Sequence, residues 1–538
     1  MSAQSYINVI VPLRLDWEPV YSVPEGLELT PGDRVSVLFS GKEYLGVVSR
    51  VNVTPGDGLR EDQILPILGK EEDLPRITPQ EMSFWSVLSS YYLCSAGEVY
   101  NSVYFRDRVA PRKWAPRNRS AIAAEPVLSP GCQNAFSEVL TAFSKHKTVL
   151  FKAASDKARA DIYLSLAVNA IKSGKSVIYL VPDIALTMSL QERISAVFPD
   201  LCIYNSALTP ARRRDIVLEA RLGRPMVVLG TRSSLFIPFS NLGLVIVDQE
   251  HESSYKQDSP APRYHARETA IMLAGILGAN VILGSPTPSL ESLYNAGTGL
   301  FAQVECEDCS GSATHYPVTV IDTVAERRKR GMSGDVSLKM LALVKRVTDS
   351  GGKVLAVSWE PQEQLQGADF VTPYAVRNIS VEGYSLVALL DADSLLGRQD
   401  FRSDEHTLQL LRRLSSSCPL VLQTKEPGHP VFTLDIYPQM LQERMQFGYP
   451  PFTRLVKLTF EESDERRQTL RSRFLCNRIR EVVRPYSDPQ ILGPEKGEIR
   501  ILFKRDRNLV KGKEALYREI CSFQQQYSCR ITIDVDPV

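Results

Sequence analysis

Four short apolar runs, separated by stretches with helical periodicity, place the strongest constraint on the fold of this 538-residue chain. They read SVIYLVP, PMVVLG, LGLVIVD and ANVILG and lie between Ser176 and Gly284. Continuous apolar runs without polar alternation are typical of strands buried on both faces of a parallel sheet. Because the runs alternate with helical stretches, they predict an α/β fold, a parallel sheet with helices on both faces. Ligands of such sheets bind beyond the carboxyl ends of the strands.

An acidic segment follows one of these runs, in LVIVDQEHESSYKQ from Leu244 to Gln257. Asp248 stands where nucleotide-hydrolysing α/β domains hold Mg²⁺, and the next carboxylate in such domains positions the attacking water. Here the next residue is Gln249. Its neutral amide can hold a water but cannot take its proton, and loss of a general base typically lowers a rate about 10²–10⁴-fold. The segment predicts a nucleotide site that lacks part of its chemistry.

The composition is that of an ordinary globular protein, with 43% hydrophobic and 23% charged residues. The length predicts three or four domains. A formal net charge of +1 leaves any binding of nucleic acid to local patches. The first residues do not resemble a signal peptide, and the best apolar run, Ile271 to Leu283, is too short to span a bilayer. We expect a cytoplasmic protein without a membrane segment.

A series of longer motifs runs along nearly the whole chain. They are VPLRLDWEPVYSVPEGL, LVPDIALT, GTRSSLFIPF, DQEHESSYKQ, APRYHARE, LGSPTPSLES, DADSLLGRQDFRSDEHTLQLL, YPPFTR, ILGP and DVDP. Together they resemble the primosomal protein N′ (PriA-type) family, the replication-restart DNA helicases of bacteria. The resemblance implies RecA-like helicase lobes, with ATP and zinc as cofactors of the family.

The resemblance and the local patterns together imply five segments. They are a β-rich domain like the family's 3′-DNA-end-binding domain (1–105), a basic linker (106–127), a first RecA-like lobe (128–300), a reduced second lobe without a zinc module (301–435) and an α+β C-terminal domain (436–538). Residues 84–100 are expected to form one helix. The family's aromatic-acidic pair falls on Pro19 and Val20, so the family's pocket residues for a 3′ end do not transfer cleanly, and capture of a 3′ end stays open.

The family's phosphate-binding loop is replaced in FKAASDKARADIYL, from Phe151 to Leu164. Such a loop needs glycines, a Lys for the β- and γ-phosphates and a hydroxyl for Mg²⁺. The resemblance places Arg159 at the Lys position and Ala160 at the hydroxyl position. The glycine positions carry Ala153, Asp156 and Ala158. With Asp248 and Gln249, these residues predict a vestigial site that does not bind nucleotide tightly and does not hydrolyse ATP.

Two further family elements are reduced in the second lobe. No arginine-rich element follows QLLRRL, and an arginine finger can contribute about 10³–10⁵ in rate. Arg412 and Arg413 lie nearby and are interpreted as a solvated helix end. Cys306 and Cys309 form the one C-x-x-C, whereas a closed zinc site needs four ligands. A surface pair of thiols is the preferred interpretation, and no metal site is predicted.

Several basic segments are candidates for contact with DNA. The connector carries Arg112, Lys113 and Trp114 and is either a solvated linker or a strap that tracks phosphates, with its Trp stacked on a base. Arg232 lies in a loop type that contacts the DNA backbone in related helicases. The strongest patch runs from Lys496 to Lys513 and includes Lys504, Arg505 and Arg507. A polar group after the acidic motif consists of Lys256, Arg263, Tyr264, His265 and Arg267. These residues either contact DNA or form salt bridges within the protein.

We therefore expect a non-catalytic, DNA-binding primosome component that recognises stalled or abandoned replication forks. Its expected partners are forked or branched DNA of any sequence, other replication-restart and primosome proteins, and single-stranded DNA-binding protein. Two alternatives stay open. One is an ATP-dependent 3′-to-5′ DNA helicase with an atypical nucleotide site, and the other is a protein-interaction scaffold that has lost DNA binding.

Overall fold

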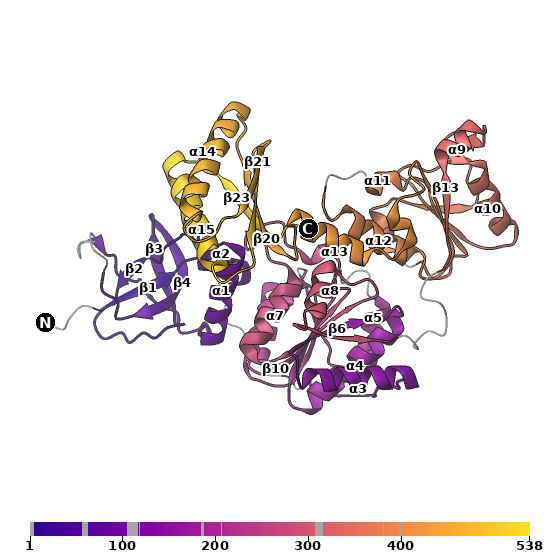
Figure 1. Ribbon diagram of the computed structural model, residues 1–538. Coiled ribbons are helices and arrows are strands. Elements are labelled where there is room, and N and C mark those ends of the chain that lie inside the picture. The colour runs from indigo at the N-terminus through magenta and orange to yellow at the C-terminus, as the bar shows by residue number, and fades with distance from the viewer. Residues whose placement is uncertain are drawn as a thin grey trace.

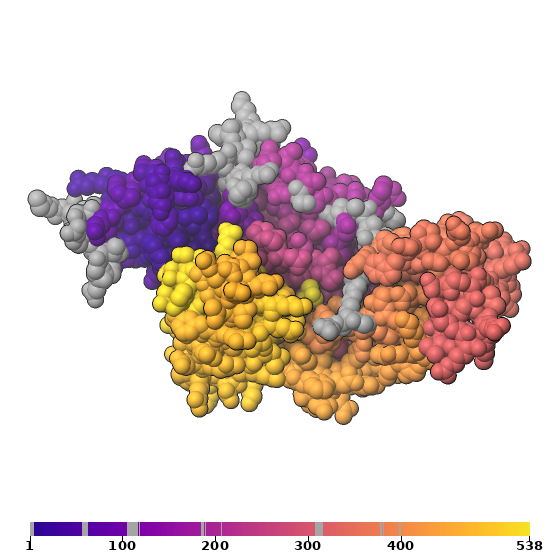
Figure 2. All heavy atoms as spheres, turned by 90° about the horizontal axis from the view of Figure 1, so that it is seen from above, coloured from indigo at the N-terminus to yellow at the C-terminus, as the bar shows by residue number. Residues whose placement is uncertain are grey.

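Four sheets of four or more strands, each with its own helices, organise the part of the chain that the structure describes (Figure 1). The computed structural model describes residues 5–538 except 56–62, 105–116, 118, 184–187, 206, 307–315, 380 and 397–399. The N-terminal sheet lies at one end of the molecule and the sheet of the second lobe at the other, in both overall views (Figures 1 and 2). No helix in the described ranges is long and apolar enough to cross a membrane.

The N-terminal domain is an antiparallel sheet with two helices. Its strand order is β2-β1-β4-β3-β5. The elements are β1 (Tyr6–Ile10), β2 (Val20–Ser22), β3 (Arg34–Phe39), β4 (Lys42–Val51), β5 (Gly69–Lys70), α1 (Pro79–Tyr92) and α2 (Ala96–Tyr104). The single helix expected over 84–100 is therefore wrong. Leu93 adopts a left-handed conformation with φ 54°, which ends α1, and Ser95 with Glu98 caps a new helix.

The first lobe is a seven-stranded parallel sheet of order β12-β6-β11-β10-β7-β9-β8. The four apolar runs of the sequence form β7, β9, β10 and β11, which are neighbours in this sheet, so the predicted α/β fold is confirmed. Its strands are β6 (Thr148–Lys152), β7 (Ser176–Leu180), β8 (Cys202–Tyr204), β9 (Val227–Gly230), β10 (Leu242–Asp248), β11 (Asn280–Ser285) and β12 (Ala302–Glu305). Its α-helices are α3 (Pro130–Phe143), α4 (Asp156–Lys172), α5 (Met188–Val197), α6 (Pro210–Arg221), α7 (Ala266–Leu277) and α8 (Leu290–Gly297). Two short 3₁₀ helices, Arg232–Phe236 and Ser253–Tyr255, follow β9 and β10.

The second lobe is a smaller parallel sheet of order β13-β19-β18-β16-β17. Its strands are β13 (Val318–Asp322), β16 (Val354–Val357), β17 (Ala368–Val371), β18 (Leu386–Leu389) and β19 (Leu420–Thr424), with a short hairpin of β14 (Met332–Ser333) and β15 (Val336–Ser337). Its helices are α9 (Thr323–Arg328), α10 (Leu338–Asp349), α11 (Asp393–Leu396), α12 (Ser403–Leu414) and the 3₁₀ helices Ala375–Asn378 and Pro430–Thr433. Helix α13 (Tyr437–Phe447), which the sequence patterns assign to the last segment, packs against the core of this lobe through Met440.

The C-terminal domain pairs an antiparallel sheet of order β21-β22-β20-β23 with two long helices. The elements are β20 (Thr453–Phe460), α14 (Glu465–Val483), β21 (Gln490–Glu495), β22 (Glu498–Lys504), α15 (Leu509–Tyr527) and β23 (Ile531–Val535). One buried core runs from α1 through α7 of the first lobe into this domain and includes Trp85, Leu273 and Val535. Leu290 of α8 is buried in the core of the second lobe. Apolar contacts thus join all four units.

Candidate functional site

The residues of the predicted nucleotide site lie at the carboxyl edge of the first lobe's sheet. Strand β6 ends at Lys152, and the loop Ala153–Ser155 leads into α4. Strand β10 ends at Asp248, separated from β6 by β11 alone. Because the three strands are parallel, their ends meet at one edge. Arg159, in the first turns of α4, thereby faces the carboxylate of Asp248.

The start of α4 is closed by groups of the chain itself. The Ser155 side chain accepts a hydrogen bond from the backbone N–H of Ala158 at 3.2 Å, which satisfies one of the N–H groups that open a helix. Ala153 and Ala160 are buried. The methyl group of Ala160 therefore stands where Mg²⁺ binding would need a hydroxyl.

The guanidinium of Arg159 fills the loop. It donates to the carbonyls of Ala153 at 2.7 Å and Ala154 at 3.3 Å, pairs with Asp156, and donates to Oδ1 of Asp248 at 3.2 Å. Its side chain is 1% exposed. Burial opposes its charge, but Asp248 and Asp156 together raise the pKa of Arg159 above its usual value. The loop thus encloses a permanent cation supplied by the chain.

Asp248 is held by three donors on one oxygen. Its Oδ1 accepts from Arg159, from the Tyr163 hydroxyl at 3.3 Å and from the Gln249 backbone N–H at 3.0 Å. Burial raises the pKa of Asp248, and the Arg159 guanidinium opposes that rise. Tyr163 reaches this position because residue 284 is glycine, since a Cβ there would lie 1.4 Å from the tyrosine hydroxyl oxygen. Asp248 is therefore engaged with partners inside the protein.

The two residues after Asp248 have structural roles. Gln249 adopts a left-handed backbone with φ 52° that turns the chain sharply after β10. Glu250 is fully buried and accepts from the Ser289 backbone N–H at 2.7 Å and from Arg267 at 2.8 Å. Ser292 also donates to it, at 2.9 Å. This carboxylate therefore stabilises the N-terminus of α8, where a negative charge is favourable.

A buried network of charges joins the two lobes at the same helix end. Glu405 of α12 accepts from the Leu290 backbone N–H at 2.8 Å and from Arg444 at 2.6 Å. Glu291 of the first lobe pairs with Arg402 at 2.8 Å and with Arg444 at 3.3 Å. Burial raises the pKa of Glu291, but Arg402 and Arg444 hold it below its usual value. Sequence reasoning missed this network because the partners that join the two lobes are more than a hundred residues apart.

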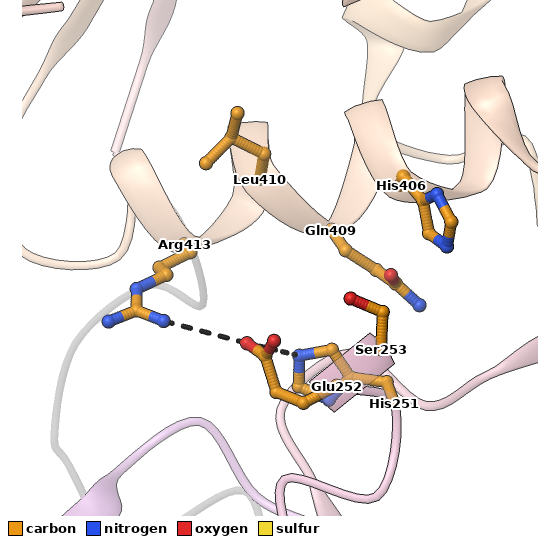
Figure 3. A pocket seen from close by; sticks show the side chains of 7 residues that line it. All are labelled: His251, Glu252, Ser253, His406, Gln409, Leu410 and Arg413. Atoms are coloured by element: carbon orange, nitrogen blue, oxygen red, sulfur yellow. Dashed lines mark ion pairs between the residues drawn. The ribbon is translucent and has the colours of Figure 1, made fainter. Parts of the chain in front are cut away.

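A small pocket lies between the acidic segment and α12 (Figure 3). Glu252 of the first lobe faces Arg413 of the second, and their charged atoms are 3.7 Å apart. Burial lowers the pKa of His251, whose Nδ1 lies 2.7 Å from the Ser285 hydroxyl. The remaining lining residues are Ser253, His406, Gln409 and Leu410.

The arginines at the end of α12 are not a solvated helix end, so that interpretation is wrong. Arg412 donates to the Leu434 carbonyl at 3.0 Å and lies over the Tyr437 ring, 4.8 Å from its centroid. Arg413 pairs with Glu252 across the lobes. Both arginines are fixed by tertiary contacts that the sequence pattern does not reveal.

Arg232 and the polar group after the acidic motif make internal contacts. Arg232 donates to the carbonyls of Ser254 at 2.7 Å and Lys256 at 3.0 Å. Lys256 is buried and pairs with Asp534 of the C-terminal domain at 2.7 Å. Arg267 pairs with Glu250 and Glu268. Of the two interpretations of this group, salt bridging agrees with these contacts.

The basic patch near the C-terminus divides into exposed and buried members. Lys504, Arg505 and Arg507 are exposed, although Arg505 donates to the Pro451 carbonyl at 2.9 Å. Lys513 is buried against α1 and donates to the carbonyls of Ser90 at 3.2 Å and Tyr91. Burial lowers the pKa of Lys513 to about 7. The patch is therefore smaller than the sequence indicates, because its last lysine faces the N-terminal domain.

Other predicted residues fall elsewhere. Arg112, Lys113 and Trp114 lie outside the described residues, as does Cys309. Cys306 is buried, so the surface interpretation is wrong for it. Within the described ranges, no three His, Cys, Asp or Glu side chains are grouped as a metal site requires. Tyr21, which directly follows Pro19 and Val20, is held inside the N-terminal domain: its hydroxyl donates to the Leu38 carbonyl at 3.0 Å, and burial raises the pKa of this tyrosine to about 12.

The family model and the similar proteins found by comparison carry the same name. Residues 8–104 match a family described as the 3′DNA-binding domain (3′BD) of PriA. Replication restart protein PriA of Haemophilus influenzae is 28% identical over 66% of this chain and 64% of its own length. The same protein of Chlamydia pneumoniae is 34% identical over 60% of this chain and 54% of its own. The chain thus spans less than two thirds of these relatives.

Among solved structures, RecG bound to a three-way DNA junction aligns with 68% of this chain and 49% of its own, at 14% identity and a TM-score of 0.38. The parallel sheets described above form two α/β lobes, which lie between the N-terminal and C-terminal domains in the sequence. The first of those domains carries the 3′DNA-binding match, and the PriA relatives cover most of the chain. The chain is therefore similar to PriA-type replication restart proteins, over up to 66% of its length.

Proposed function

We propose that this protein binds branched DNA in replication restart and neither binds nor hydrolyses ATP. The observation that carries the proposal is the position of Arg159, whose buried guanidinium occupies the phosphate loop and pairs with Asp248. The protein would recognise forks through their backbone and recruit restart factors.

A nucleotide would have to displace Arg159 from two kinds of partner, backbone carbonyls and carboxylates. The Ala153 and Ala154 carbonyls and the Asp248 carboxylate would each lose a donor. Breaking a buried ion pair by removing one partner typically costs about 3–5 kcal/mol. A phosphate would also meet the carbonyls of the loop instead of convergent N–H groups, which repels an anion. The residues at this site do not fit Mg²⁺ and ATP.

The residues that would activate the attacking water and stabilise the transferred phosphate are also unsuited to ATP hydrolysis. Gln249 cannot act as a general base. Arg413, the arginine of the second lobe that faces the acidic segment, is paired with Glu252. The lobes are further tied by Glu405, Arg444 and Glu291. This network needs no nucleotide, which favours a fixed arrangement of the lobes.

The proposed contacts with DNA are of the phosphate type. Lys504 and Arg507 are exposed at the end of β22, and neither has a carboxylate partner within the described residues. Such contacts position a protein on the backbone without reading sequence. We further propose forked DNA, other primosome proteins and single-stranded DNA-binding protein as partners. Arg232 is less suited to this role, since its guanidinium is tied to two carbonyls.

One purified sample tests the proposal. ATP hydrolysis is measured with and without forked DNA, beside a DNA-dependent ATPase as positive control, and binding to the same fork is followed by fluorescence anisotropy. We expect salt-sensitive fork binding with no hydrolysis above background. Turnover that disappears on Asp248→Ala would overturn the proposal in favour of an atypical helicase. Absence of salt-sensitive binding would favour a protein scaffold.

A further inference from the structure

Helix α14 of the C-terminal domain is strongly basic, with the sequence ERRQTLRSRFLCNRIREVV. It carries six arginines against Glu465 and Glu481, and Arg484 follows at its C-cap. The opposite face buries Leu475, Ile479 and Val483 in the domain core. In Figure 1 the helix lies on the outer side of its domain, away from the second lobe.

The arginines of α14 fall into two sets. Three are paired with carboxylates: Arg467 with Asp464 at 3.5 Å, Arg471 with Glu462, and Arg478 with Glu519 at 2.6 Å. The other set is exposed and has no carboxylate partner among the residues that the structure describes. This set consists of Arg466, Arg473, Arg480 and Arg484.

The second set forms a straight line. Arg466, Arg473 and Arg480 are seven residues apart, which places them on one face of a helix at intervals of about 10 Å. Arg484 follows one turn later. From Arg466 to Arg484 the line is about 27 Å long, which matches about eight base pairs of duplex DNA at 3.4 Å each.

The exposed apolar surface on this face is small. The Phe474 ring packs against Phe523 and Tyr527, with centroids 6.1 Å and 5.8 Å away, so it belongs to the domain's own aromatic cluster. Leu470, 69% exposed, is the other large apolar side chain on this face. A protein interface of useful affinity needs a larger apolar centre. Arg480 donates to Oδ1 of Asn477 at 3.0 Å, but this amide is neutral. A row of arginines without carboxylate partners and with little apolar area instead fits a phosphate backbone.

The line also leads toward the surface already proposed to bind DNA. The segment after α14 meets the start of α15, since a Cβ on Gly512 would lie 3.3 Å from Cβ of Ser487. Lys504 and Arg507 immediately precede α15. The C-terminal end of the arginine line is thus at the same end of the domain as these two residues.

We propose that the outer face of α14, through Arg466, Arg473, Arg480 and Arg484, binds the backbone of one duplex arm of a branched DNA. The inference rests on the proposed DNA-binding function and adds to it a second surface specific for duplex. Phosphates of one arm would lie along the helix, while Lys504 and Arg507 contact the DNA nearer the branch.

The experiment compares three variants of the full chain with the wild type on a fork whose duplex arms exceed eight base pairs. The first changes Arg466, Arg473 and Arg480 to Ala, and the second changes the same residues to Lys. The control removes three exposed cations of the second lobe, Arg328, Lys345 and Arg346. Circular dichroism establishes that each variant is folded, and exposed substitutions of this kind usually change stability by no more than about 0.5 kcal/mol.

Affinity is measured by anisotropy between 50 and 200 mM salt. Each lost duplex contact lowers the log–log slope by about 0.9, so three give up to about 2.7, or about 40-fold less change over this range. The Lys variant and the control should keep the wild-type slope. Shortening the arms well below eight base pairs should remove the difference between the Ala variant and the wild type.

An Ala variant with the wild-type slope on long arms overturns the inference while leaving the proposed DNA binding intact. That result is also the one expected if α14 binds an acidic protein segment instead. A wild type that shows no salt-sensitive binding overturns the proposed function, and this inference with it. If the Ala variant does not fold, the slope of Arg473→Glu, a single exposed substitution, decides by the same criterion.

Discussion

Arg159 lies in the first turns of α4 and Lys504 is the last residue of β22, and the two cations have opposite surroundings. Arg159 is buried, with two carboxylates and two carbonyls around its guanidinium. Lys504 is exposed, and no carboxylate within the described residues pairs with it. A cation whose charge is already matched inside the protein has little to offer an incoming phosphate, whereas an unmatched one attracts it. This contrast underlies the two proposals, that Arg159 closes the nucleotide site and that the surface around Lys504 binds DNA.

The largest expected effect comes from removing the buried cation. Arg159→Ala leaves Asp248 buried without its charge partner, and we expect a loss of about 3–5 kcal/mol in the free energy of unfolding. Urea denaturation followed by circular dichroism measures it. The matched control, Arg466→Ala, removes an exposed arginine and should change stability by no more than about 0.5 kcal/mol. Equal effects in the two variants would break the comparison.

Removing exposed cations should instead change binding to DNA. Lys504→Ala with Arg507→Ala removes two phosphate contacts, which lowers the salt slope by about 1.8, or about 12-fold over a fourfold range of salt. Adding Arg505→Ala should change little more, because Arg505 already donates to Pro451. Anisotropy on forked DNA measures both. An unchanged slope in the double variant would contradict the assignment of this surface.

The pH dependence of stability distinguishes a buried lysine from an exposed one. The pKa of Lys513 is lowered to about 7 in the folded protein by burial, against 10.5 for an ordinary lysine. Above pH 7 the unfolded chain therefore binds more protons at this site than the folded protein, and stability rises with pH, by up to about 1.4 kcal/mol per pH unit until the unfolded pKa is reached. Lys513→Met should remove this rise, whereas Lys504→Met should keep it. Urea denaturation at pH 7, 8 and 9 makes the comparison, and a rise retained in Lys513→Met would contradict the buried assignment.

Much of the fold could be predicted because local patterns determine it. The four apolar runs became adjacent parallel strands, since continuous apolar sequence is compatible with burial on both faces. The break at Leu93 could not be predicted, because a leucine gives no signal of a left-handed backbone. Likewise, the burial of Lys513 depends on α1, more than four hundred residues earlier in the chain.

The site was predictable in its composition but not in its contacts. The sequence places an arginine at the position of the phosphate-binding lysine. Only the structure shows that its guanidinium points into the loop and donates to Asp248. The roles of Glu250 and Glu405 at the start of α8 depend on packing between the lobes. The seven-residue spacing of arginines in α14 is visible in the sequence. Which of these arginines pair with carboxylates is known only from the fold.

Binding of a fluorescent ATP analogue with Mg²⁺ tests most directly whether Arg159 has replaced the nucleotide. The titration is carried out on the wild type and on Asp248→Ala, with unlabelled ATP as competitor. Because the guanidinium occupies the loop and holds Asp248, we predict no saturable binding to either protein. Saturable binding to the wild type that ATP displaces and that Asp248→Ala abolishes would contradict this conclusion.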